Sequence, residues 1–295
     1  MNNTKSLQKL DSFILKILAM IFMTLDHVGL FLLQRDPGSV VGNVFRIIGR
    51  LAFPLYAFFL AEGMRYTHNR GMYILRIGIM WAVITLGETI FVYGMQQRYS
   101  PNTLSPEPFT DLFFSMLVLW CLLLPNWKKV FAILPLSPMI LSFVVDVYER
   151  MNSVTIEWFP YYLRFGYGLY GLLMILLFFI APWIVKKLYG SRVREIGMSM
   201  EEFEESVEYR RQTNLISIGG LIISVVLFWS IGYIARGIDY APFDVYYLGK
   251  GSYALLAGIL LYFYSGRRGH NSLAFRIISY LYFPAHLLLL FLIFS

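Results

Sequence analysis

Residues 13–33 read FILKILAMIFMTLDHVGLFLL and are apolar apart from a lysine, a threonine and the adjacent pair Asp26 and His27. A helix of about 20 mostly apolar residues is long enough to cross the hydrocarbon core of a bilayer. The whole chain has this character, because 58% of its 295 residues are hydrophobic, only 15% are charged and the mean hydropathy is +0.60. Soluble domains are about 45–50% apolar and about 25% charged. The sequence therefore predicts an all-α, polytopic transmembrane helical bundle.

The same length criterion predicts nine transmembrane helices. The predicted spans are residues 13–33, 48–64, 72–93, 109–125, 130–147, 160–185, 214–234, 248–265 and 274–294. No repeat, low-complexity tract or soluble domain separates them, so residues 1–295 are predicted to form a single integral membrane domain. The polar stretch 186–213 has acidic and basic residues at i,i+3 and i,i+4 spacing, which favours a solvated cytoplasmic helix.

The distribution of Lys and Arg predicts the orientation of the chain. With a cytoplasmic N-terminus, the segments assigned to the inside carry twice as many Lys and Arg as those assigned to the outside, in agreement with the positive-inside rule. This bias also explains the formal net charge of +7, so the predicted partner is a lipid bilayer and not a nucleic acid. The predicted location is a cell membrane, either a bacterial inner membrane or a plasma membrane. Cys121 is the only cysteine, which excludes an intrachain disulfide.

Ionisable residues inside the predicted spans mark the candidate functional site, because each costs about 2.5–3.5 kcal/mol near the bilayer centre. Counting along the helices sorts them into two layers, with His286 in the last span. An imidazole with carboxylates in the outer layer suits acid–base chemistry, and a basic inner layer suits a phosphorylated ligand. The outer layer holds Asp26, His27, Arg50 and Glu88, and the layer near the cytoplasmic face holds Lys16, Glu62, Arg65, Arg76, Arg267 and Arg268.

One spacing connects the two layers. Lys16 and His27 are 11 residues apart, which on a helix returns to within about 20° of the same face after a rise of about 16 Å. Asp26 lies about 100° away from His27, so it is predicted to meet Arg50 or another helix. Glu88 is the predicted orienting partner of the His27 ring.

Each of these residues also has a purely structural interpretation. Lys16 can extend its ammonium group to the membrane interface. Each of the two histidines can do no more than hydrogen-bond to a neighbouring helix. Glu62 and Arg65 can neutralise each other at i,i+3 spacing. Arg267 and Arg268 can do no more than help to set the orientation of the chain in the membrane.

Three blocks of the sequence resemble the motifs of TraX-type membrane proteins. The first is LKILAMIFMTLDHVG at residues 15–29. The second is RIIGRLAFPLYAF at 46–58, followed by AEGMRYT at 61–67. The third is YSGRRG at 264–269, followed by YFPAHL at 282–287. Two positions depart from the family pattern: Ser265 stands where the family has Asn, and RFGYGLYG at 164–171 lacks an Asp that often precedes Tyr-Gly.

The resemblance implies an enzymatic activity. TraX is known as an acetyltransferase that acts on the N-terminus of conjugative pilin, and the family is more distantly similar to acyltransferase-3 proteins and to heparan-alpha-glucosaminide N-acetyltransferase. In acyltransferase-3 proteins a basic residue, ten intervening residues and a His mark the first helix, and Lys16 and His27 have this spacing. The resemblance thus implies acetyl-CoA as the donor on the cytoplasmic side, an acceptor near the outer face, and no metal ion.

The resulting hypothesis is a transmembrane acyltransferase that moves an acetyl or other acyl group from acyl-CoA to an amine or hydroxyl. His27 would act as general base or transient acyl carrier, while Asp26 and Glu88 orient its ring or stabilise its charged form. Arg50 would stabilise negative charge on the thioester oxygen. The remaining substrate-binding residues of this hypothesis are Lys16, Glu62, Arg65, Arg76, Arg267, Arg268 and His286. A peptide, a glycan and a lipid-linked molecule all stay open as acceptor.

Two other functions fit the same sequence. Buried Asp, His, Glu and Arg residues also mark the substrate and proton pathways of transporters and flippases, although no inverted repeat or matching pair of broken helices is present. A non-catalytic assembly factor of a secretion or conjugation apparatus is the third possibility, which would leave the intramembrane charges unexplained.

Overall fold

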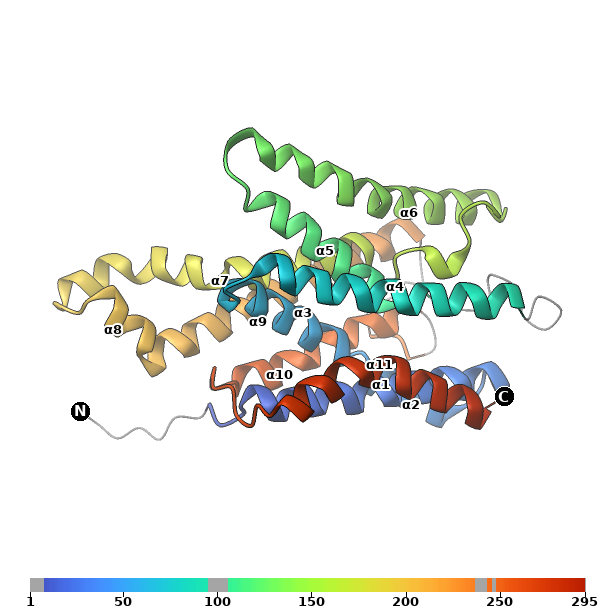
Figure 1. Ribbon diagram of the computed structural model, residues 1–295, viewed down its shortest axis with the longest axis horizontal. Coiled ribbons are helices and arrows are strands. Elements are labelled where there is room, and N and C mark those ends of the chain that lie inside the picture. Colours follow the sequence, from blue (N-terminus) through green and yellow to red (C-terminus); the bar gives the residue numbers. More distant parts are fainter. Residues whose placement is uncertain (1–7, 95–105, 237–242, 246–247, 295) are drawn as a thin grey trace. The chain divides into compact units, whose positions relative to one another are not determined.

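The computed structural model describes residues 8–94, 106–236, 243–245 and 248–294, and in these ranges the chain is helical without a β-strand (Figure 1). The α-helices are α1 (Ser12–Arg35), α2 (Val40–Gly49), α3 (Ala52–Tyr66), α4 (Arg70–Gly94), α5 (Pro108–Leu122), α6 (Ile133–Asn152), α7 (Gly168–Glu195), α8 (Met200–Glu205), α9 (Val207–Arg236), α10 (Ala257–Tyr262) and α11 (Leu273–Phe294). The 3-10 helices are η1 (Asn126–Ala132), η2 (Tyr161–Leu163) and η4 (Leu248–Leu256). The expected all-α class is confirmed.

The helix starts follow from short polar residues that precede the apolar runs. Asp11 accepts a hydrogen bond from the backbone N–H of Ile14 at 2.9 Å and so caps α1. Ser39 caps α2 in the same way. Such side chains satisfy backbone donors that the first turn of a helix leaves without a partner.

Seven segments of the described chain are long and apolar enough to cross a membrane. They are Ser12–Arg35, Val40–Tyr66, Arg70–Ile90, Asn126–Glu149, Tyr161–Glu195, Val207–Ile234 and Leu273–Phe294. The predicted span 109–125 corresponds to the shorter apolar helix Pro108–Leu122. The predicted span 248–265 is a 3-10 helix followed by the six-residue α10 instead of one continuous α-helix. A multi-pass membrane protein is thereby supported, while nine spans and a cytoplasmic N-terminus stay predictions.

The chain divides into two compact units, of which the first comprises residues 1–59 and 177–295. In this unit α1 packs against α2 and α11, which lies beside it (Figure 1). α1 and α2 approach closely at glycines: a Cβ on Gly49 would lie 2.4 Å from the Cβ of Asp26, and one on Gly29 would lie 2.8 Å from the carbonyl oxygen of Gly42. Small residues of this kind allow close helix packing in membranes.

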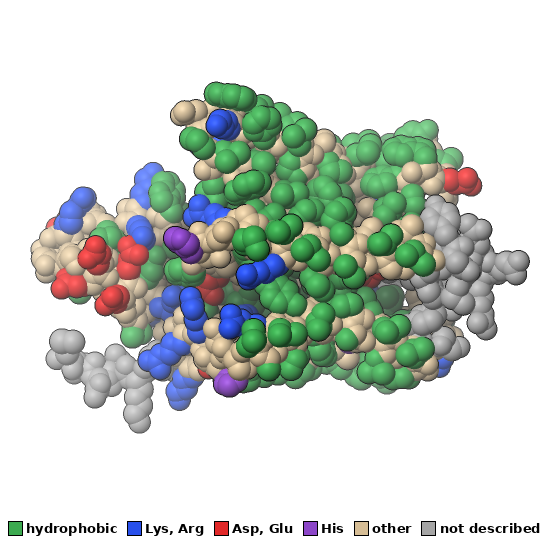
Figure 2. All heavy atoms as spheres, in the orientation of Figure 1, with side chains coloured by type: hydrophobic (Ala, Val, Ile, Leu, Met, Phe, Trp, Pro, Cys, Tyr) green, Lys and Arg blue, Asp and Glu red, His purple; other side chains and the backbone are tan. Residues whose placement is uncertain are grey.

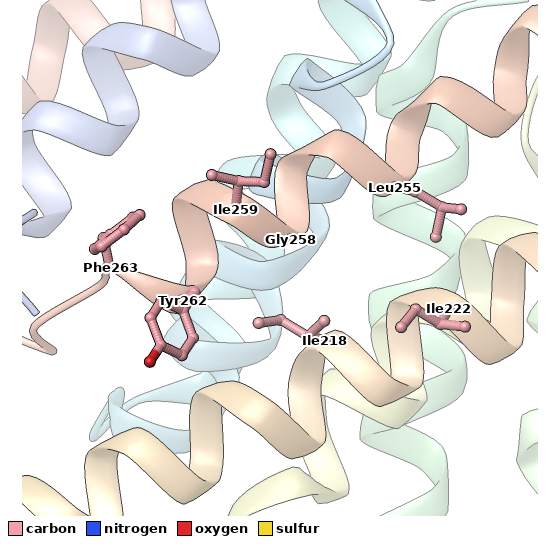
Figure 3. Close-up of a pocket in the computed structure, with 7 residues that line it drawn as sticks. All are labelled: Ile218, Ile222, Leu255, Gly258, Ile259, Tyr262 and Phe263. Atoms are coloured by element: carbon pink, nitrogen blue, oxygen red, sulfur yellow. The ribbon is translucent and has the colours of Figure 1, made fainter. Parts of the chain in front are cut away.

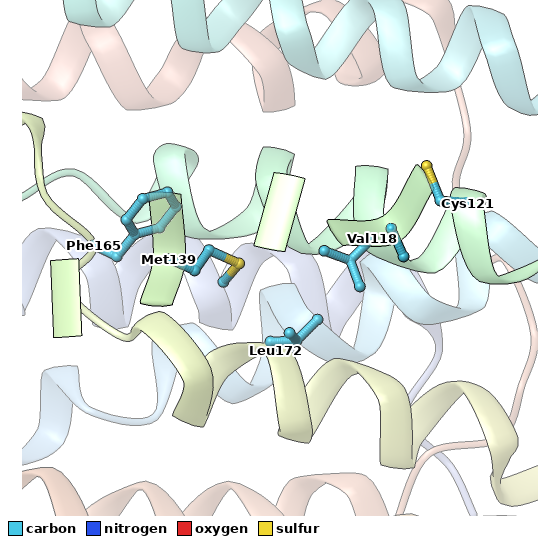
Figure 4. Close-up of a cluster of buried hydrophobic side chains, with 6 residues drawn as sticks. Val118, Cys121, Met139, Phe165 and Leu172 are labelled. Carbon is cyan, nitrogen blue, oxygen red and sulfur yellow. The ribbon is translucent and has the colours of Figure 1, made fainter. Parts of the chain in front are cut away.

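The second unit comprises residues 60–176. Its apolar core joins α5, η1, α6 and the start of α7 (Figure 4). A buried arginine, Arg164, fixes the segment before α7 through ion pairs with Asp146 and Glu149. Asp111 of α5 accepts hydrogen bonds from three successive backbone N–H groups at 166–168. The core residues are Val118, Cys121, Ala132, Met139, Phe165 and Leu172.

Candidate functional site

One face of α1 carries both ends of the candidate site. Met20, Met23 and His27 are buried, and together with Lys16 they follow the i, i+4, i+7, i+11 pattern of a single helix face. The ammonium group of Lys16 lies 5.5 Å from the ring centre of Phe59. Lys16 and His27, at the two ends of this helix face, therefore both face other parts of the protein. The His27 ring does not point into lipid.

Asp26 forms ion pairs with two arginines of α2. One carboxylate oxygen accepts from Arg46 and the other accepts from Arg50. The three side chains are only 14–21% exposed. The predicted pairing of Asp26 with Arg50 is confirmed, and Arg46 is an additional partner.

The ring of His27 meets the ring of His286. Both side chains are buried, at 9% and 6% exposed, and Nδ1 of His27 lies 3.2 Å from Nε2 of His286. Nδ1 of His27 also lies 2.9 Å from the carbonyl oxygen of Met23, and Nδ1 of His286 lies 2.9 Å from the carbonyl oxygen of Tyr282. The partner at Nδ1 is thus a histidine of the last helix, where the sequence suggested Glu88.

For two neutral rings, these contacts favour one placement of the ring hydrogens. A carbonyl oxygen only accepts, so Nδ1 of His286 donates to Tyr282 and its Nε2 carries a lone pair. That lone pair accepts from Nδ1–H of His27, which also faces the carbonyl of Met23. Nε2 of His27 is left with the lone pair of its own ring, and among the described residues no hydrogen bond occupies it. In this arrangement Nε2 is the His27 ring nitrogen that carries an available lone pair.

Two further residues hold His286 in place. The ring of Tyr282 stacks on His286 with centroids 5.2 Å apart. The Tyr282 hydroxyl lies 2.5 Å from the hydroxyl of Thr24 on α1. This bond links α11 to α1 one turn away from the histidine contact.

The basic loop 264–270 is attached to the start of α1. The backbone of Leu10 pairs with Phe263 and Ser265, and Ser12 donates to the carbonyl oxygens of Arg267 and Arg268. The side chains of Arg267 and Arg268 are exposed. Figure 2 shows Lys and Arg side chains gathered at the end of the first unit where α1 and α11 begin.

The side chain of Arg210 lies in close contact with this loop at Gly266. Gly266 has a φ of +74°, and a Cβ at this position would lie 2.3 Å from the guanidinium of Arg210. Arg210 also lies over the ring of Tyr264. Only glycine combines this backbone conformation with that contact.

The remaining predicted site residues belong to the second unit. The side chain of Glu88 on α4 interacts with that of Glu107, which directly precedes α5. Glu62, Arg65 and Arg76 lie on α3 and α4 of the same unit, with Arg65 over the ring of Tyr66.

The sequence alone does not indicate several residues of the site. Arg46 precedes Arg50 by one helical turn, and this i,i+4 spacing was a usable signal. Tyr282 lies within a motif block but carries no charge to mark it. No spacing rule could connect His27 with His286, which is 259 residues away.

An apolar groove of the first unit lies outside this site. It is formed by α9, η4 and α10 and is lined by apolar side chains and one tyrosine (Figure 3). No acid or base lines it, so it offers no acid–base chemistry. The lining residues are Ile218, Ile222, Leu255, Gly258, Ile259, Tyr262 and Phe263.

Comparison with known proteins identifies the family. The sequence profile of the TraX protein family matches residues 12–185, which include the first two motif blocks. The chain is also 41% identical over 67 residues to "Probable fimbrial assembly protein FimC, serogroup H1" of Dichelobacter nodosus. That stretch spans 23% of this chain and 27% of the relative. No solved structure matches the chain. Since the family profile covers more than half of the sequence and the helices are those of a multi-pass membrane protein, the chain belongs to the TraX family.

Proposed function

We propose that this protein transfers an acyl group, in the simplest case acetyl, from acyl-CoA to an amine or hydroxyl acceptor. The observation that supports it most is the buried His27 ring, whose Nδ1 is held by Met23 and His286 so that Nε2 presents a lone pair. All steps of the proposed mechanism use residues of the first unit. Glu62, Arg65, Arg76 and Glu88 belong to the second unit and carry no step in it.

The donor is proposed to bind at the basic loop. Arg267 and Arg268 would contact the phosphates of acyl-CoA, with Lys16 of α1 as a third cation. The loop is hydrogen-bonded to the first residues of α1, so its position relative to the helix face that carries Lys16 and His27 is fixed. The rise of about 16 Å from Lys16 to His27 is then the length that an extended donor has to span.

His27 is proposed to move the proton. Nε2 accepts the proton of the acceptor amine or hydroxyl while the nitrogen or oxygen of the acceptor attacks the thioester carbon. The tetrahedral intermediate then expels the CoA thiolate as the C–S bond breaks, and Nε2–H returns the proton to the sulfur. The charged imidazolium formed in between is stabilised by the carboxylate of Asp26, the preceding residue.

Arg50 is proposed to stabilise the oxyanion of that intermediate. Its two hydrogen bonds to Asp26 hold the guanidinium in one orientation, so the donor group needs little rearrangement when negative charge develops. Asp26 thereby acts on the reaction through Arg46 and Arg50 and through its charge, without a hydrogen bond to the His27 ring.

The test of this mechanism compares His27→Ala with His286→Gln and the parent protein. Release of the CoA thiol from acetyl-CoA would be measured on the purified chain in detergent. Removal of a general base should lower kcat about 10²–10⁴-fold in His27→Ala. His286→Gln keeps a hydrogen-bonding side chain beside His27 and should lose less activity, with an unchanged KM for acetyl-CoA. Equal rates of His27→Ala and the parent would remove His27 from the chemistry.

A second measurement tests the donor site separately. Lys16→Ala combined with Arg267→Ala should weaken CoA binding and reduce its dependence on salt, because exposed charge interactions are screened by salt. Isothermal titration at two salt concentrations measures both quantities. Unchanged affinity and salt dependence would refute the phosphate assignment.

A non-catalytic role in pilus or fimbria assembly is the second candidate function, favoured by the printed name of the FimC relative. The same titration separates the two, since an assembly factor has no reason to bind acyl-CoA. If the acyltransferase proposal holds, that name favours a peptide as acceptor.

A further inference from the structure

One face of α2 carries three polar residues whose arrangement indicates a second binding site near His27. Asn43, Arg46 and Arg50 follow each other at i, i+3 and i+7, so they share a helix face. On one side this face meets Asp26 of α1 through both arginines. On the other side it meets η4, where Lys250 donates to the side-chain oxygen of Asn43 at 2.8 Å.

The charges of this cluster are mostly positive. Lys250 interacts electrostatically with Arg46 and Arg50 and with the carboxylates of Asp26 and Asp244. Both arginines form ion pairs with Asp26. The described residues of the cluster therefore include three cations and two carboxylates. Bringing like charges together in partly buried positions is unfavourable, and it is characteristic of sites that bind carboxylate or phosphate groups.

The cluster lies directly against the residue that carries the proposed base. A guanidinium N–H of Arg46 is 3.4 Å from the carbonyl oxygen of Asp26, which belongs to the peptide that joins Asp26 to His27. Arg46 also interacts electrostatically with the His27 ring. The cluster therefore lies beside the turn of α1 that carries His27.

We propose that Asn43, Arg46 and Lys250 bind an anionic group of the acceptor, a carboxylate or a phosphate, and thereby present its amine or hydroxyl to His27. The role as acceptor site rests on the proposed function. Anion binding at this cluster does not, because it requires neither acyl-CoA nor turnover.

The experiment measures anion binding to the purified full chain in a neutral detergent at constant ionic strength. Inorganic phosphate and acetate are titrated separately, and the rise in the thermal unfolding midpoint gives the affinity. All variants carry Arg267→Gln and Arg268→Gln, so that phosphate does not bind at the loop 264–270. The preferred probe identifies the class of group: phosphate indicates a phosphorylated acceptor, and acetate indicates a carboxylate.

Lys250→Gln should weaken the affinity for the preferred anion at least tenfold, because it removes a charge and keeps a donor for Asn43. Lys250→Arg should retain binding. Lys186→Gln is the matched control, since Lys186 pairs with Glu204 at an exposed position elsewhere in the first unit, and it should leave the affinity unchanged.

Asn43→Asp provides a second variant of almost identical size, in case Lys250→Gln does not fold. The new carboxylate would form an ion pair with the ammonium group of Lys250 and so abolish anion binding. The proposal is overturned if neither anion raises the unfolding midpoint, or if both variants bind as tightly as their parent. His27→Ala should lose turnover and still bind the anion, so a failure of the catalytic proposal is distinguishable from a failure of this one.

Discussion

At the scale of single residues, Asp26 has the most demanding environment of the site. Its carboxylate forms ion pairs with two guanidinium groups that are about four-fifths buried. Removing one partner of a buried ion pair leaves an uncompensated charge and typically costs about 3–5 kcal/mol. Asp26 is therefore needed to keep the two buried guanidinium groups stable.

The predicted effect of Asp26→Asn is a loss of stability of roughly 3–5 kcal/mol, because Arg46 and Arg50 lose their common counter-charge. Thermal unfolding of the purified protein, followed by tryptophan fluorescence, measures it. The control is Glu204→Gln, which removes the exposed ion pair with Lys186 and should cost less than about 1 kcal/mol. Equal unfolding midpoints for the two variants would show that the buried pairs contribute little.

The same residues show what a sequence can predict about a site. The direction of Asp26 was predictable, since the helix period turns it away from His27 and toward a neighbouring helix, on which Arg50 was one of the expected partners. The contact of His27 with His286 was not predictable, because it depends on how α11 packs against α1. Helix periodicity gives the direction of a side chain but does not identify the helix that it meets.

At the scale of elements, the packing of α1 on α2 positions the ion pairs. Gly49 lets the two helices approach until the backbone of α2 touches Asp26. A side chain at this position would push the helices apart and lengthen the bonds from Arg46 and Arg50. The close packing of α1 on α2 thus requires a small residue at position 49, although glycine has a poor intrinsic helix propensity.

Gly49→Ala should therefore destabilise the protein by about 1–3 kcal/mol, the usual cost of overpacking a close contact. The control is Gly87→Ala in α4, where, among the described residues, nothing beyond the adjacent residues and the backbone of the same helix lies within 4 Å of the added Cβ. That change should be neutral or slightly stabilising, since alanine favours helix more than glycine does. Chemical unfolding curves of both variants measure the difference, and a Gly49→Ala protein as stable as the control would refute the tight packing.

Element boundaries were predicted less well than element type. The apolar run 248–265 has the composition of a membrane span, yet it forms η4 and the short α10. It contains two glycines at 249 and 251 and one at 258, which weaken a continuous helix. Gly251 also admits the ring of Trp229, so the irregular segment is packed against α9.

At the scale of the whole molecule, composition was sufficient to predict a helical membrane protein, and the distribution of Lys and Arg predicts its orientation. The described helices support the first prediction, while the second concerns the bilayer and needs its own experiment.

The orientation can be measured with engineered cysteines, because Cys121 is the only native one. In a Cys121→Ser background, Ser191→Cys introduces an exposed thiol after the long apolar part of α7, in the predicted cytoplasmic loop. A membrane-impermeant maleimide should label it only after the cells are permeabilised. Labelling of intact cells would reverse the predicted orientation of this loop.

The contact between His27 and His286 has a consequence for biosynthesis. A ribosome releases the first helix into the bilayer long before it makes the last one, since the two residues are 259 positions apart. Throughout synthesis the imidazole of the first helix lacks its eventual neighbour, whereas Asp26 finds both arginines within 24 residues. The nascent chain can thus pair Asp26 with its two arginines early, whereas the contact between the two histidines forms only after the last helix has been made.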